Sequence, residues 1–252
     1  MEKLIIENNE LIKYNEAEND ESLIIPEGVR VIKEGAFDSN TMGVKEIIYP
    51  STLEKIEDYA TDGALWVEKI DLPKKLTDIG AGAFFDWLNL KRILLPYGLK
   101  KISVEAFGMC KDLEEALIPE TVEVIDDSAF YNCVSLKSID LKKVKKIGIY
   151  AFWNCQSLTE IDLSSVSELG DCAFEGCIGL KNVIMPTNID KIGEYTFWGC
   201  TSLTKIEIPK SVKRIGKKAF GGCTSLAEIR VPKGCKLCWG WKKGTQAKVV
   251  RY

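Results

Sequence analysis

The chain has 252 residues, of which 46% are hydrophobic and 28% are charged, and its formal net charge at pH 7 is −3. This composition allows a proper core, and so small a net charge does not favour nucleic acid or an acidic membrane as a partner. The sequence contains no histidine, which excludes Ser-His-Asp triads, histidine bases and histidine metal ligands.

Residues 1–22 are acidic and contain one hydrophobic strand-like piece, residues 4–6. We expect this segment to be an N-terminal cap on the first open edge of a repeat array. The apolar run is too short for a signal-peptide core, and no stretch of about 18 apolar residues predicts membrane insertion. The sequence as it stands therefore predicts a cytoplasmic protein. A chain trimmed of its signal peptide would look the same and would be secreted or at the cell surface.

Residues 23–232 are organised by a repeat of 22 to 24 residues. The dipeptide Ala-Phe, or a degenerate copy of it, marks each repeat at 36–37, 60–61, 83–84, 106–107, 129–130, 151–152, 173–174, 196–197 and 219–220. Cysteine commonly follows the Phe by three residues, leucine by six and isoleucine by nine. Such fixed spacing indicates a solenoid of stacked repeats.

Each repeat contains a predicted short strand of the type Leu-x-x-Ile-x-Leu, in which apolar and polar residues alternate. Proline usually follows and ends the strand because it has no N–H for the ladder. A second short extended piece leads to another apolar residue, such as Ile102, before the next Ala-Phe. One repeat alone cannot bury these residues, whereas stacked repeats share one core.

The consensus Ala-Phe-x-x-Cys-x-x-Leu-x-x-Ile-x-Leu-Pro resembles the BspA-like bacterial leucine-rich repeat, with clear copies at 129–141, 151–163 and 196–209. The resemblance implies an α/β-type leucine-rich-repeat fold, a right-handed solenoid with a parallel β-sheet of short strands. Turns, short extended pieces and 3-10 or helical turns would form the other side. Family members are often surface or secreted proteins implicated in adhesion to host proteins or other cells.

Residues 233–252 depart from the repeat and carry Trp239, Trp241 and the strand-like sequence AKVVRY. We expect them to be a C-terminal cap, because an uncovered parallel edge invites aggregation. No linker or second domain is predicted.

Six of the nine cysteines occupy the repeat position three residues after the Phe. We interpret them as small buried hydrophobes. Disulfides between adjacent repeats are the alternative, but side chains that point the same way make poor bridging geometry. Cys235 and Cys238 form a lone C-x-x-C, for which metal or redox chemistry is the weaker interpretation, since zinc needs two further ligands. No cofactor is predicted.

The outward residues of the predicted strands are the first candidate protein-binding set: Lys69, Asp71, Arg92, Leu94, Glu115, Leu117, Asp140, Glu160 and Asp162. The alternative for the charged members is that they only support their neighbours across strands. Leu94 and Leu117 are harder to explain in that way, because they are apolar at positions that should face water.

The position directly after the Phe gives a second candidate set, a possible binding ridge of Phe85, Tyr131, Trp153 and Trp198. The alternative is that each ring lies flat over the neighbouring repeat.

These patterns predict a non-enzymatic protein–protein interaction module, a scaffold, adaptor or ligand-binding protein that uses the exposed sheet face. The alternative is an exported cell-surface adhesin for host or neighbouring-cell proteins. An enzyme is disfavoured because acid pairs such as Asp140 and Asp162 should lie on an open face without a pocket. The expected partner is a protein. Nucleic acid is not expected, because Lys and Glu are interspersed, and the sequence indicates no oligomeric state.

Overall fold

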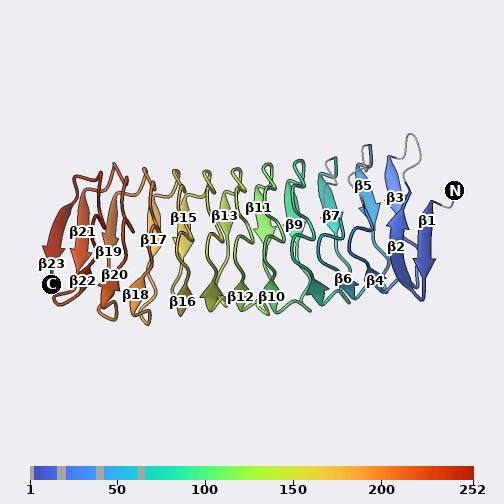
Figure 1. The fold of residues 1–252 in the computed structure, drawn as a ribbon, viewed down its shortest axis with the longest axis horizontal. Helices are drawn as coiled ribbons and strands as arrows, with labels where there is room; N and C mark the ends of the chain where they lie inside the picture. The colour runs from blue at the N-terminus through green and yellow to red at the C-terminus, as the bar shows by residue number, and fades with distance from the viewer. Residues whose placement is uncertain (1–2, 16–20, 38–42, 62–65) are drawn as a thin grey trace.

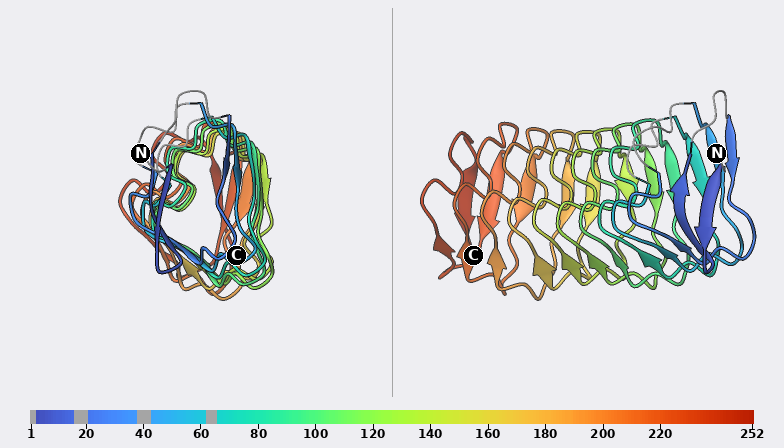
Figure 2. Two further views of the ribbon diagram at one scale, coloured as in Figure 1. Left: turned by 90° about the vertical axis from the view of Figure 1, so that its right-hand side faces the viewer. Right: turned by 45° about the vertical axis from the view of Figure 1, so that its right-hand side comes forward.

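The computed structural model describes residues 3–15, 21–37, 43–61 and 66–252. In these ranges the chain coils into a rod with its two termini at opposite ends (Figure 1). Successive turns nearly superpose when the rod is seen along its length (Figure 2). The strands form two rows, which we call the upper row and the lower row from their places in Figure 1.

The upper row contains the strands predicted from the Leu-x-x-Ile-x-Leu pattern, followed by one strand from the predicted C-terminal cap. In order along the rod they are β3 (Ser22–Ile24), β5 (Glu46–Ile48), β7 (Lys69–Asp71), β9 (Arg92–Leu94), β11 (Glu115–Leu117), β13 (Ser138–Ile139), β15 (Glu160–Asp162), β17 (Asn182–Ile184), β19 (Lys205–Glu207), β21 (Glu228–Val231) and β23 (Lys248–Arg251).

The lower row contains the second extended piece of each repeat, preceded by an N-terminal hairpin. Its strands are β1 (Leu4–Glu7), β2 (Glu10–Tyr14), β4 (Val31–Ile32), β6 (Lys55–Ile56), β8 (Asp78–Ile79), β10 (Lys101–Ile102), β12 (Val124–Ile125), β14 (Lys146–Ile147), β16 (Glu168–Leu169), β18 (Lys191–Ile192), β20 (Arg214–Ile215) and β22 (Lys236–Leu237).

Equivalent residues of successive repeats lie side by side in both rows. Glu115 of β11, for example, pairs in parallel with Arg92 of β9 on one side and with Ser138 of β13 on the other. The middle residue of these strands points inward and the flanking residues point outward, as the alternation in sequence predicts. The exposed outer surface of the upper row is therefore a regular array of side chains.

The two ends differ from the repeats to different degrees. β1 and β2 form an antiparallel hairpin, and β2 then pairs in parallel with β4. At the other end, β22 and β23 simply extend the lower and upper rows. The predicted cap boundaries at residues 22 and 233 stay predictions. Among the described residues, no helix is long and apolar enough to cross a membrane.

The turns between the rows correct the predicted fold class, because the described residues contain no 3-10 or α-helical segment. Each regular turn has a left-handed residue just before the Ala and another two residues after the Phe. Glu105 and Met109, with φ of 54° and 64°, are one such pair, and Ser128 and Asn132 are the next. A helix needs consecutive right-handed residues, so a left-handed residue on each side of a three-residue stretch prevents one.

The core is built on a continuous stack of phenylalanine rings. Neighbouring rings have centroids 5.3 to 5.6 Å apart and planes within 14° of parallel, and they run through Phe84, Phe107, Phe130, Phe152, Phe174, Phe197 and Phe220. All are buried. Burial of each ring contributes about 2 kcal/mol from lost apolar surface, and ring contacts add to this.

The stack is interrupted where Thr61 takes the place of a phenylalanine. The next repeat compensates with Trp87, which stands at the position that is cysteine in the following repeats. Its indole is fully buried, contacts Phe84 edge-on at 5.0 Å and donates a hydrogen bond from Nε1 to the carbonyl of Thr61 at 2.6 Å. A residue from a different repeat position thus fills the missing part of the core.

Candidate functional site

The upper row presents its outward residues as one face, which we call the outer face. The structure brings together on it all nine residues of the first predicted set, from Lys69 to Asp162. Leu94 and Leu117 lie directly opposite each other on β9 and β11, as predicted. Leu94 has 58% of its surface exposed, whereas Leu117 is half-buried.

Exposed aliphatic residues recur along the same outward line. Ile24 and Ile48 are paired in register and are 62% and 44% exposed, and Ile184 on β17 is 57% exposed. Cross-strand contact between paired aliphatic residues contributes at most about 1 kcal/mol, and their exposed surface gains no hydrophobic stabilisation. The fold therefore explains only part of their presence on this face.

The charged residues of the outer face mostly pair with one another. Arg92 contacts Glu115 across strands at 2.7 Å, and Lys69 contacts Asp71 within one strand at 2.9 Å. Charged residues just before these strands also pair, since the ammonium group of Lys91 lies 2.8 Å from the carboxylate of Glu68. That hydrogen bond is the main cause of the raised pKa of Lys91. The Arg92–Glu115 and Lys91–Glu68 pairs have the geometry of the predicted cross-strand support, whereas Lys69–Asp71 lies within one strand. Each of the three pairs is exposed and contributes below about 1 kcal/mol.

Asp140 and Asp162 have a local structural role that the sequence did not suggest. They belong to the two repeats that carry Lys142 and Ser164 where other repeats carry proline. The backbone N–H of Lys142 donates to Asp140 at 3.1 Å, and that of Ser164 donates to Asp162 at 2.8 Å. Each aspartate therefore satisfies an N–H that proline would not have. The ammonium group of Lys142 also bonds Asp140 at 2.6 Å, and this bond chiefly lowers the pKa of the carboxyl.

A shallow hollow lies on the outer face at these two repeats, where no pocket was expected. Its volume is about 570 Å³, and its lining includes Leu117, Ser138, Asp140, Asp162 and Ile184. It forms because Ser138 is small and because the hydrogen-bonded sheet is interrupted between β13 and β15. Histidine and cysteine are absent from the lining, and Asp140 and Asp162 already bond their own turns.

The second predicted set, the aromatic ridge, is only partly brought together. Tyr131 and Trp153 stack on each other, with centroids 5.2 Å apart. Phe85 and Trp198 each lie over a glycine of the next repeat instead. A Cβ at Gly108 would come within 3.0 Å of the Phe85 ring, and one at Gly221 within 2.8 Å of the Trp198 ring. This geometry favours the alternative in which each ring lies on the neighbouring repeat.

The six cysteines of the repeat are buried, as predicted. Each thiol donates a hydrogen bond to the carbonyl of a phenylalanine in the preceding repeat, at 3.1 to 3.3 Å. Burial raises the pKa of Cys110, Cys177 and Cys223 to about 12, so these thiols stay protonated at neutral pH. A small side chain with a weak donor suits this position.

The remaining three cysteines, Cys172, Cys235 and Cys238, lie outside the ladder that the six stacked repeat cysteines form. Cys172 occupies the left-handed position before Ala173, and Cys238 accepts a hydrogen bond from Nε of Arg214 at 3.2 Å. The part of the chain that the structure describes contains no group of three or more Cys, Asp or Glu arranged to hold a metal ion.

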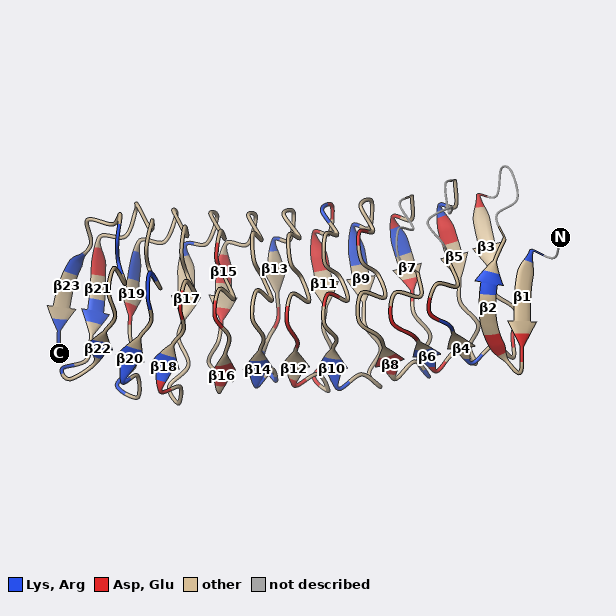
Figure 3. Ribbon diagram, viewed as in Figure 1, with Lys and Arg blue, Asp and Glu red and all other residues tan. Residues whose placement is uncertain are grey.

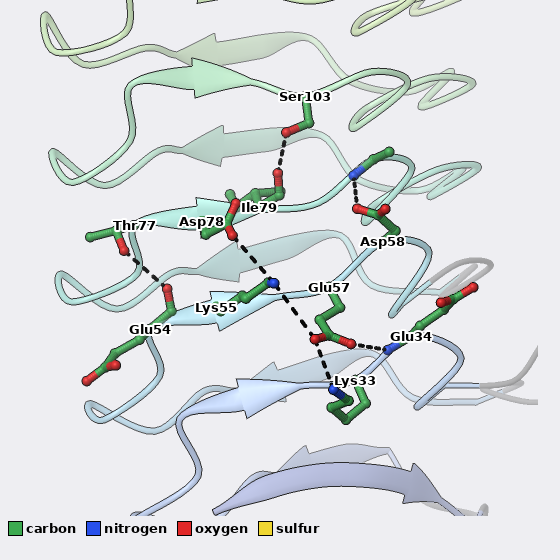
Figure 4. A network of polar contacts seen from close by, with 11 residues as sticks. Lys33, Glu34, Glu54, Lys55, Glu57, Asp58, Thr77, Asp78, Ile79 and Ser103 are labelled. Carbon is green, nitrogen blue, oxygen red and sulfur yellow. Dashed lines mark hydrogen bonds and ion pairs between the residues drawn. The ribbon is translucent and has the colours of Figure 1, made fainter.

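A basic surface on the lower row was missed in the sequence, because Lys and Glu were treated as interspersed throughout the chain. At the N-terminal end of the lower row, Lys and Glu are indeed interspersed. Figure 4 shows Glu57 between Lys33, at 3.0 Å, and Lys55, at 3.8 Å, with Asp78 on the far side of Lys55. Toward the C-terminal end, however, the lower row is basic (Figure 3). Residues 189–252 include 14 Lys and Arg but four Asp and Glu. Counting charge by position along the repeat would have found this.

The comparisons with known proteins agree with this architecture. No curated protein matches the sequence. Among solved structures, a leucine-rich repeat protein of T. pallidum has a TM-score of 0.56 at 23% identity and covers 86% of this chain and 82% of its own. A leucine-rich cell surface protein of Faecalibacterium prausnitzii has a TM-score of 0.45 at 20% identity and covers 99% and 92%. The pneumococcal vaccine antigen PcpA has a TM-score of 0.48 at 17% identity and covers 97% and 85%.

The family comparison covers most of the molecule. The BspA type leucine rich repeat region, in six copies, matches residues 13–137 and 123–238. These ranges contain the phenylalanine stack, all six repeat cysteines and almost the whole upper row. The chain therefore belongs to the BspA-type leucine-rich repeat family.

Proposed function

We propose that the protein is a non-enzymatic interaction module that binds a protein partner through the outer face of the upper row. The observation that carries this proposal is the line of exposed aliphatic residues, Ile24, Ile48, Leu94 and Ile184, on a face where many of the charges are paired. An apolar spot within a polar frame is typical of protein interfaces. The hollow beside Ile184 adds a place for a partner side chain.

The paired charges also favour a protein over a highly charged partner on this face. Arg92 and Glu115 neutralise each other, as do Lys69 and Asp71, so the outer face at β7, β9 and β11 offers no field of one sign. Affinity here would come from burial of the aliphatic residues. The paired charges would then contribute specificity and orientation at the rim.

The test is an affinity capture from the native organism with two matched double variants. Leu94→Glu with Ile184→Glu places two charges on the outer face. Ile149→Glu with Ile178→Glu makes the same change at two other exposed aliphatic residues, 43% and 44% exposed against 58% and 57%, in turns outside the upper row. We expect the wild type and the second variant to capture the same proteins and the first variant to lose them. Retention of the same partners by the first variant would refute the use of this face.

An exported adhesin is the second function that the sequence resemblance suggests, and it would use the same face. The two proposals differ in where the protein acts. Antibody labelling of intact cells would favour the adhesin, and labelling only after permeabilisation would favour a cytoplasmic scaffold or adaptor.

A further inference from the structure

We propose that a second surface, the basic strip, binds an extended acidic peptide segment of a protein partner through its carboxylates. The basic strip consists of Lys191, Lys213, Arg214, Lys217, Lys218 and Lys236. It lies on the last turns of the lower row, apart from the outer face, and extends the function proposed above by a second contact (Figure 3).

The centre of the strip is a line of like charges in register. Lys191 of β18 lies directly opposite Arg214 of β20, and Arg214 lies directly opposite Lys236 of β22. Neighbouring strands are about 4.8 Å apart. Like charges placed directly opposite each other destabilise a sheet. The fold therefore gains nothing from this arrangement, which is suited to an external anion.

Lysines at the position of Lys191 form ion pairs in two earlier repeats of the lower row. Lys55 of β6 lies 3.8 Å from Asp78 of the next strand, and Lys101 of β10 lies 3.8 Å from Asp126. By contrast, no ion pair joins any residue of the strip within residues 66–252. Carboxylates thus form ion pairs with lysines at this position in earlier repeats, whereas at the strip Glu194 acts on Arg214 without forming an ion pair.

Neighbouring side chains favour a carboxylate-rich peptide over a nucleic acid. Single strands are bound by stacking bases on open aromatic rings. Here the ring of Tyr195 already lies under the ammonium group of Lys218 at 5.3 Å, and the 72% exposed ring of Trp239 has the ammonium group of Lys243 over one face at 5.8 Å. Arg214 is the one arginine of the strip, and its Nε already donates a hydrogen bond to Cys238 Sγ. Bidentate hydrogen bonding to a phosphate that uses Nε is therefore not available. Lysines act as point charges, which carboxylates can meet singly.

The length of the strip also suits a short segment. Its three strands span about 10 Å along the rod. An extended peptide places residues on one face about 6 to 7 Å apart, so a few acidic residues would be in reach of all six cations. The outer residues of the strip, Lys213 and Lys217, widen it on either side of β20.

The experiment measures binding of a fluorescent deca-glutamate peptide by anisotropy at low and moderate salt. The strip variant carries Lys191→Glu, Lys213→Glu and Lys236→Glu. The control variant carries Lys74→Glu, Lys75→Glu and Lys100→Glu, which change net charge equally at exposed residues elsewhere. We expect the wild type and the control to bind alike and the strip variant to bind at least about tenfold more weakly. Added salt should weaken wild-type binding, because it screens exposed charges.

A single variant separates binding from folding. Arg214→Glu places a carboxylate between Lys191 and Lys236 and so restores the alternation seen at Lys55. We expect it to unfold at the same or a higher urea concentration and yet to bind the peptide more weakly. Equal peptide binding by the strip and control variants would overturn the proposal. So would tighter, strip-dependent binding to a DNA duplex or to vesicles of phosphatidylserine and phosphatidylcholine than to deca-glutamate.

Discussion

The regular stretch of the core, from Phe84 to Phe220, and the irregular turn at Thr61 solve the same packing problem differently. In the regular stretch each repeat supplies one phenylalanine and, from Cys110 onward, one cysteine, and identical residues stack. At Thr61 the ring is missing, and Trp87 fills the space from the cysteine position of the next repeat. Close packing of the interior requires the space to be filled, whichever repeat position supplies the side chain.

The largest effect is expected from Trp87→Ala. It removes a fully buried indole and leaves the carbonyl of Thr61 without its donor, so we expect a loss of about 3–5 kcal/mol in the free energy of unfolding. Trp87→Phe, which keeps a ring but loses the N–H, should cost less, about 1–3 kcal/mol. Urea unfolding measures both. No loss for Trp87→Phe would contradict the role of the hydrogen bond, and equal losses for the two variants would contradict the role of the ring in filling the space.

A double variant tests whether a phenylalanine at position 61 with a cysteine at position 87 can replace the pair of Thr61 and Trp87. Thr61→Phe alone should overpack the turn against Trp87 and cost about 1–3 kcal/mol. In the Trp87→Cys background the same substitution restores the consensus and should stabilise, with a coupling of about 0.5–3 kcal/mol. Additive effects in urea unfolding would show that Trp87 does not occupy the place of the missing ring.

Ionisation of the ladder thiols should distinguish the regular stretch from the irregular turn, which has Trp87 in place of a cysteine. Burial raises the pKa of thiols such as Cys110 from the ordinary 9.0 to about 12. Because the pKa is higher in the folded state, the contribution of each protonated thiol to the free energy of unfolding is fully present below pH 9. It is lost as the pH rises toward 12, by up to about 1.4 kcal/mol per pH unit for each thiol. In urea unfolding from pH 8 to 10.5, Cys110→Ala should therefore weaken the pH dependence. An unchanged slope would be inconsistent with a buried, protonated thiol.

The smallest effect concerns repeats that lack proline within the regular stretch. Asp140→Ala should cost about 1 kcal/mol because it removes the acceptor of the Lys142 N–H. Because the pKa of Asp140 is lowered, this contribution is present above the ordinary carboxyl pKa and is lost as the pH falls below it.

Asp71 is the matched control, since its repeat has Pro73 and the carboxylate contacts only the exposed Lys69. Asp71→Ala should change stability by less than about 0.5 kcal/mol. In addition, Lys142→Pro should reduce the cost of Asp140→Ala. Equal losses of stability for Asp140→Ala and Asp71→Ala would contradict the proposal that the Asp140 carboxylate is needed because its repeat has an N–H where other repeats have proline.

The sequence predicted the stacking, the inward columns and the outer face, because a fixed period determines which residues become neighbours. It could not predict the compensation at Thr61, since Trp87 and Thr61 occupy different repeat positions. Helical turns were expected from the family resemblance. They are absent from the described residues because left-handed conformations at positions such as Glu105 and Met109 depend on the hydrogen bonds of adjacent turns.

The candidate site was predicted to a similar degree. The nine outward residues were found because strand alternation fixes which side chains point outward. The bond from Asp140 to its own turn depends on a missing proline, and the hollow depends on a local break in the sheet. Neither follows from the average repeat. The right-handed coil stays a prediction.

The most direct test of the account is a distance, because the outer face exists only if equivalent residues stand one strand apart along the rod. Spin labels attached through unnatural amino acids at Lys69 and Lys205, equivalent exposed positions on β7 and β19, are separated by six strand intervals. Pulsed electron paramagnetic resonance should give one narrow distribution near about 29 Å. A broad distribution, or a main distance below about 20 Å, would contradict the stacked coil and with it the outer face.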